Sequence, residues 1–116
     1  MPRDEATWLN RSAIIITPKA PYVAWANALG EGHRFDDARD AEGPPVFLGP
    51  DADTTAEVEA FVADNFDLFF EHWLNAWWTD EADWPKDRTL TMFYEWFDVR
   101  ISSMIIDTVR EPLELE

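Results

Sequence analysis

The sequence predicts a small α+β domain, or a small α/β domain, in which a three-stranded mixed sheet packs with three helices. Three patterns carry this prediction. Residues 12–17 form a β-branched apolar run, residues 54–78 repeat apolar side chains every three or four positions, and residues 99–110 are apolar on two alternating faces. The predicted order is strand, helix, strand, helix, helix, strand. Because 116 residues with 47% hydrophobic side chains can form a core without cross-links, we expect one domain over residues 1–116.

The first strand is predicted over Ser12–Thr17. Its apolar run has no polar alternation, which is typical of a central strand covered on both faces. Pro18 and Pro21 end the strand, and Pro21 can begin a helix that ends at Gly30. The first strand–helix–strand unit can then form a right-handed parallel crossover.

A polar segment without periodicity, residues 31–45, is expected to be a mobile surface loop. The short apolar run Val46–Leu48 follows, with Pro45 before it and Gly49 after it, and we predict a second strand there.

A long helix is predicted to begin at the capping box formed by Thr54 and Glu57, in which each side chain accepts from the other residue's backbone N–H. Its apolar positions continue to Trp78 and spread over more than one face toward that end. We therefore expect this helix to be covered on several sides and to form the centre of the core.

The turn composition of residues 79–86 separates this helix from the next one, which Asp87 or Thr89 can cap and which runs through Phe97. Residues 99–110 then alternate with both faces largely apolar.

We expect a third strand there, covered on both faces and placed beside the first, with its direction left open. Pro112 ends it, and residues 113–116 are expected to form a frayed tail.

The net charge of −15 comes from 24 acidic against nine basic side chains, and it disfavours direct binding to nucleic-acid phosphates. The plain interpretation is a solvated acidic surface. The absence of cysteine excludes disulfides and thiolate metal sites. Residues 1–10 have no apolar signal region, and no run of eighteen apolar residues occurs. We therefore expect a cytoplasmic protein that does not enter a membrane.

Aromatic residues gather between Phe61 and Phe97, which hold twelve of the chain's seventeen. Trp77, Trp78 and Trp84 fall where the long helix meets its loop, and we call them the tryptophan corner. Tryptophan beside acidic residues is typical of a protein-binding hot spot, so the corner is a candidate site for a protein partner. The alternative is that the three rings cover the end of the sheet.

A second candidate is an anion site at Lys86 and Arg88, which lie close before a predicted helix start. The alternative is structural: Arg88 can pair with Asp80, Glu81 or Asp83.

Metal binding and catalysis have weaker support. His33 lies near Asp36, Asp37 and Asp40, but this spacing matches no established site, and His72 has no second histidine on its helix face. We predict no metal and no cofactor.

Three acidic residues at helical spacing, Asp64, Asp67 and Glu71, could act as acid or base, although a solvated acidic stripe explains them as well. No nucleophile or oxyanion hole accompanies them, and we predict no catalytic residue. Asp107 interrupts an apolar strand and is expected either to face water at the strand end or to be buried beside Arg88, Arg100 or Arg110.

Three segments carry a resemblance to a known family. The segments Ile16–Trp25, with the pattern Ile-Thr-Pro-Lys-x-Pro-Tyr-x-x-Trp, Trp84–Thr89 and Trp96–Val99 resemble a family of small acidic bacterial proteins with no assigned function. The resemblance covers most of the chain and is loose between Gly30 and Pro45. It implies a bacterial cytosolic protein and implies no reaction type.

The leading hypothesis is a non-enzymatic interaction or regulatory module that binds a protein partner through the tryptophan corner and the adjacent acids. The second is an acidic inhibitor or immunity-type protein that blocks a basic, nucleic-acid-binding target. The third is a small enzyme with an anion site near Lys86 and Arg88. Homodimerisation through the tryptophan corner is compatible with each.

Overall fold

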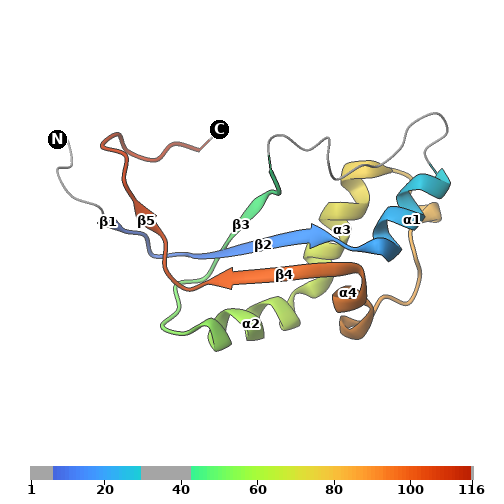
Figure 1. Ribbon diagram of the computed structural model, residues 1–116, viewed down its shortest axis with the longest axis horizontal. Coiled ribbons are helices and arrows are strands. Elements are labelled where there is room, and N and C mark those ends of the chain that lie inside the picture. Colours follow the sequence, from blue (N-terminus) through green and yellow to red (C-terminus); the bar gives the residue numbers. More distant parts are fainter. Residues whose placement is uncertain (1–6, 30–42, 116) are drawn as a thin grey trace.

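The computed structural model describes residues 7–29 and 43–115 and shows an α+β fold (Figure 1). The predicted class is confirmed. The strands are β1 (Thr7–Trp8), β2 (Ser12–Pro18), β3 (Val46–Gly49), β4 (Phe97–Ser102) and β5 (Ile106–Asp107). The helices are α1 (Ala20–Leu29), α2 (Thr55–Asp64), α3 (Phe66–Trp77) and α4 (Leu90–Trp96), with a short 3₁₀ helix, Glu81–Asp83, before α4. Of the predicted loop, residues 31–45, positions 31–42 lie outside the described residues.

Three strands form the main sheet in the order β3-β2-β4, so β2 is central and the last long strand lies beside it, as predicted. Both pairings are antiparallel, and Ile14 lies opposite Phe47 on one side and Ile101 on the other. The predicted mixed sheet with a parallel crossover is therefore wrong. The helix α1 lies beyond the end of β2 and does not cross back over the sheet, so β3 enters the sheet in the opposite direction (Figure 1).

The predicted third strand is interrupted. The strand β4 ends at Ser102, whose hydroxyl accepts the N–H of Met104 at 3.2 Å and donates to the Met104 carbonyl at 2.9 Å. The chain then turns, and β5 pairs antiparallel with β1, which the sequence did not predict. Together β1 and β5 form a two-stranded ribbon that projects beyond the helices (Figure 1).

The predicted long helix is two helices that meet at Asn65. The Asn65 side chain donates to the carbonyl of Phe61 at 2.9 Å, and its backbone leaves the helical region at φ −124° and ψ 22°. A side chain that bonds the preceding turn in this way competes with continuation of the helix. The change of direction lets α2 follow β4 while α3 crosses behind the strands (Figure 1).

Within residues 7–29 and 43–115, the helices cover only one face of the main sheet. All four helices contribute buried side chains to the core that Ile14 and Ile16 enter. On the other face Val46 and Leu48 are 56% and 60% exposed. The prediction that both faces are covered is wrong for β4, whose outward side chains Asp98, Arg100 and Ser102 are exposed, whereas those of β2 are half-buried. We call the uncovered side the open sheet face; its residues are Ala13, Ile15, Thr17, Val46, Leu48, Asp98, Arg100 and Ser102.

The core is built from aromatic rings. Phe97 lies 5.3 Å from Phe70, 5.4 Å from Phe93, 5.5 Å from Tyr22 and 6.0 Å from Trp73, measured between ring centroids. The Tyr22 hydroxyl donates to the Trp73 carbonyl at 2.7 Å, which satisfies its polar end inside the core. These contacts join α1, α3, α4 and β4.

Replacing Gly49 with alanine should destabilise the fold by about 1–3 kcal/mol, because an added Cβ overpacks a filled site. It would lie 2.8 Å from the Ile14 Cδ1 atom and also against the Ser12 hydroxyl. That hydroxyl is buried and finds no hydrogen-bond partner among the described residues, so Ser12→Ala alone should be neutral or stabilising.

Denaturant unfolding of the two single variants and the double variant gives the coupling between the sites. Recovery of part of the loss in the double variant is expected. An unchanged midpoint for Gly49→Ala would contradict the close packing of β3 on β2.

Candidate functional site

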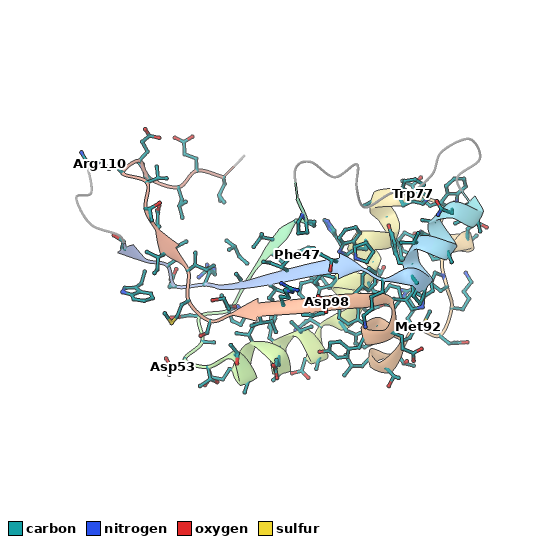
Figure 2. All side chains as sticks on the ribbon, in the orientation of Figure 1. Phe47, Asp53, Trp77, Met92, Asp98 and Arg110 are labelled. Atoms are coloured by element: carbon teal, nitrogen blue, oxygen red, sulfur yellow. The ribbon has the colours of Figure 1, made fainter. Side chains whose placement is uncertain are left out.

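The tryptophan corner joins secondary-structure elements to one another. Trp84 is 7% exposed, and its indole donates to the Trp78 carbonyl at 2.7 Å. The Trp77 indole donates to the Ala26 carbonyl at 2.8 Å, which ties α3 to α1 (Figure 2). The Trp78 indole donates to an Asp83 carboxylate oxygen at 3.0 Å. Each indole N–H of the tryptophan corner donates to an acceptor of the same chain, which favours the alternative that the three rings cover the end of the sheet. Binding of a protein partner by the corner stays a prediction.

Arg88 is the centre of an ion-pair network. Its Nε and Nη2 atoms donate to the two carboxylate oxygens of Asp67 at 2.7 and 3.2 Å, and its Nη1 atom donates to the Pro85 carbonyl at 3.0 Å. A Glu71 oxygen lies 3.8 Å from Nη2. The guanidinium carbon lies 5.9 Å from the Trp84 ring, within range of a cation–π contact.

The network shifts the ionisation of its members. The hydrogen bond from Arg88 lowers the pKa of Asp67 below its ordinary range. Partial burial, together with the charge of Asp67, raises the pKa of Glu71. Arg88 lies closer to Asp67 than to Glu71, so its stabilisation of the charged carboxylate acts mainly on Asp67.

Lys86 also contacts groups of its own chain: its ammonium lies 3.3 Å from the Ala82 carbonyl and 3.4 Å from that of Glu81. The geometry therefore favours the structural alternative for Lys86 and Arg88. The carboxylate partner is Asp67, 21 positions before Arg88, and not the nearby Asp80, Glu81 or Asp83 that the sequence suggested. Asp67 and Glu71 sit one turn apart on α3, and that spacing beside a later arginine is the signal that could have found the pair.

The acidic side chains are concentrated on one part of the fold. Residues 51–95, which contain α2, α3 and α4, hold twelve acidic against two basic side chains, whereas residues 7–19, 43–49 and 96–110 together hold two acidic and four basic ones. We call the exposed carboxylates of the first group the acidic helical layer; they are Asp51, Asp53, Glu57, Glu59, Asp64, Asp80, Glu81, Asp83, Asp87 and Glu95.

A hollow of about 400 Å³ lies among α2, α4 and β4 and is lined by Thr55, Glu59, Tyr94, Val99 and Ile101. Partial burial, and then the charge of Glu59, raise the pKa of the Tyr94 hydroxyl. A phenol with a raised pKa holds its proton more firmly, which is the opposite of activation as a base or nucleophile. The hollow gives the enzyme alternative no support.

The remaining candidates are dispersed. His33 and its neighbouring aspartates lie outside the described residues. His72 is exposed on α3, with its ring centroid 5.0 Å from that of Phe47. Asp64 belongs to α2 while Asp67 and Glu71 belong to α3, so the break at Asn65 divides the predicted acidic stripe. Within residues 7–29 and 43–115, no group of three or more histidine and carboxylate side chains is placed to hold a metal ion.

Asp107 is 8% exposed, and one of its carboxylate oxygens accepts the N–H of Val109 at 2.9 Å. This bond fixes the turn that follows β5. The burial agrees with the second of the two expectations for this residue, and the acceptor contact shows one way in which the buried carboxylate is stabilised.

A comparison with protein-family models finds no matching family, and comparisons with curated proteins and with solved structures find no similar chain. The resemblance to small acidic bacterial proteins stays a prediction. None of the helices in the described part of the chain has the length and apolar character that a membrane crossing requires.

Proposed function

We propose that the protein is a non-enzymatic interaction module whose acidic helical layer binds a basic surface of a protein partner. One observation carries the proposal: acidic side chains are concentrated over residues 51–95, which hold twelve acidic side chains against two basic ones. Of these twelve, Asp67 and Glu71 are engaged by Arg88, while ten others are exposed.

A uniform field of this kind accelerates the encounter with a basic partner and weakens steeply with salt. The acidic helical layer therefore supports the electrostatic part of the hypothesis better than the tryptophan corner supports the aromatic part. In a stricter form of the proposal, the partner is a nucleic-acid-binding protein and this chain blocks it. The carboxylates of the layer then compete with nucleic-acid phosphates for the basic surface of the partner.

Neutralising two carboxylates of the layer should weaken partner capture by about 2- to 30-fold, since each exposed pair contributes about 0.2–1 kcal/mol. The variant Glu59→Gln/Asp64→Asn removes two exposed charges from α2. The matched control Glu111→Gln/Glu114→Gln removes two exposed charges near the end of the chain, outside the layer.

The measurement is capture from a bacterial lysate by immobilised wild type and variants, quantified by mass spectrometry at about 0.1 and about 0.5 M salt. Basic proteins that are lost with the layer variant and with salt, but retained by the control, are the expected result. If they are also competed by added DNA, the blocking form is supported. Equal capture by all three chains would overturn the proposal.

A further inference from the structure

We propose that two copies of this chain associate face to face through the open sheet face. It does not depend on the partner proposed for the acidic helical layer. The register places Ala13 beside Leu48 and Ile15 beside Val46, so four apolar side chains form a continuous patch on the uncovered side of the sheet. Contiguous apolar patches on the surface of soluble proteins are often interaction sites.

The charged residues on this face are self-complementary. Asp98 and Arg100 lie two positions apart on β4, on the same side of the strand, with 3.5 Å between the Arg100 Nε atom and an Asp98 oxygen. The Arg100 side chain is 82% exposed. In a two-fold interface, residue i of one copy meets residue j of the other and the reverse, so one acid and one base side by side can pair across the axis.

The acidic side chains on the helices favour the same face-to-face arrangement. A chain with a net charge of −15 repels its own copies wherever the acidic helical layers approach each other. Sheets that pack face to face lie about 10 Å apart, and a helix adds about 10 Å on each outer side, so the two layers are held roughly 30 Å apart. The Debye length at physiological salt is about 8 Å, so their repulsion is screened.

The size of the face requires a contribution from the ribbon. Three strands about 4.8 Å apart and about 23 Å long give a footprint of roughly 300 Å², whereas a stable complex buries about 800 Å² per partner. Trp8 and Ile106 of the ribbon and Met104 in the turn before β5 are 61%, 47% and 57% exposed, and they adjoin the ends of β2 and β4 in the chain, so they are the apolar side chains proposed to supply the remaining area.

A free two-stranded ribbon is at best marginally stable in water, so a second copy would also stabilise the ribbon. The radius of gyration is 16.6 Å, against about 13 Å for a compact chain of this length, and the ribbon projects beyond the helices (Figure 1). Arg110 lies at its far end, away from the helices (Figure 2).

The test is sedimentation equilibrium of the full chain at about 10–200 µM, where a dimer of 13.5 kDa chains is expected to form reversibly. Leu48→Lys should raise the dissociation constant by about tenfold or more. Leu68→Lys is the matched control, because Leu68 is 63% exposed on α3 and lies outside the face, and it should leave the dimer unchanged.

Arg100→Asp should also weaken the dimer, and the exchange Asp98→Arg/Arg100→Asp should restore it if the pairing is two-fold. Circular dichroism confirms that each variant remains folded. Because the acidic layers are already screened at physiological salt, further salt should change the dimer much less than it changes the proposed partner complex. A wild type that remains monomeric over the whole concentration range, or Leu48→Lys and Leu68→Lys with equal effects, would overturn the inference.

Discussion

Replacing Phe97 with alanine should lower the free energy of unfolding by about 3–5 kcal/mol, the cost of removing a large aromatic side chain from a filled core. Phe97 is 1% exposed and is surrounded by the rings of Tyr22, Phe70, Trp73 and Phe93. These rings come from three helices, α1, α3 and α4. The cavity left by the substitution therefore loosens α1, α3 and α4 together, and collapse of one helix cannot fill it.

Because small domains are stable by only about 5–15 kcal/mol, this variant should be partly unfolded or melt at a much lower temperature. Thermal melting followed by circular dichroism measures the change. Leu68→Ala is the control, since Leu68 is 63% exposed and its loss should cost less than about 0.5 kcal/mol. Equal melting temperatures for the two variants would show that the aromatic cluster is not the principal core.

Local signals predicted the parts of the fold that depend on local chemistry. The Thr54 hydroxyl accepts the Glu57 N–H at 3.3 Å, so α2 begins where the capping box placed it. The Glu57 carboxylate accepts from Asp53 at 3.0 Å, one residue before the predicted donor. Thr89 caps α4 by accepting the Met92 N–H at 3.1 Å, which decides between the two predicted caps.

Features of the fold that depend on pairing between segments far apart in the chain could not be predicted from local sequence patterns. The strands β1 and β5 have two residues each and pair Thr7 with Asp107, which no periodicity over two residues can reveal. The open sheet face misled the sequence interpretation for another reason. An apolar run indicates that both sides of a strand are apolar, and it does not indicate what covers the second side. If a second copy covers it, the apolar character of Ile15, Val46 and Leu48 has its explanation.

The candidate site also has one part that could be predicted from the sequence and another part that could not. The abundance of acidic side chains is a property of composition, and their concentration over residues 51–95 can be read directly from the sequence. The spacing of Asp67 and Glu71 indicates a carboxylate pair, but the sequence alone could not select it as the partner of Arg88, because many acidic residues lie nearer in the chain, Asp80, Glu81 and Asp83 among them. Selection among them depends on how α3 and the loop before α4 pack, which brings Asp67 to 2.7 Å from the guanidinium.

Replacing Arg88 with methionine should destabilise the protein by about 1–3 kcal/mol, the range for charge-assisted hydrogen bonds. Methionine keeps the packing of the stem on Phe70 and Trp84 but leaves Asp67 and the Pro85 carbonyl without their donor. The loss stays below that of a fully buried pair because the Asp67 side chain is 46% exposed.

Arg88→Lys should restore only part of this loss, since an ammonium group cannot reach both carboxylate oxygens and the carbonyl in one plane. Arg11→Met is the control, because Arg11 is exposed and donates to the carbonyl of its neighbour Asn10. Urea denaturation compares the variants. An Arg88→Met variant as stable as the control would show that the network contributes no net stability, as exposed ion pairs often do.

The two acidic members of the network should respond to pH in opposite directions. Because the pKa of Asp67 is lowered from its ordinary value of 3.8, its contribution is fully present above pH 3.8 and is lost as the pH falls through the lowered value. The stability difference between wild type and Asp67→Asn should therefore disappear below pH 3.8.

The pKa of Glu71 is raised from 4.5, so the folded protein binds this proton more readily than the unfolded chain does. Glu71→Gln should be at least as stable as wild type at neutral pH, and that advantage should disappear as the pH falls toward 4.5. Urea denaturation of the three chains between about pH 3 and 7 measures both trends, and parallel curves for all three would contradict the asymmetry that Arg88 imposes on the pair.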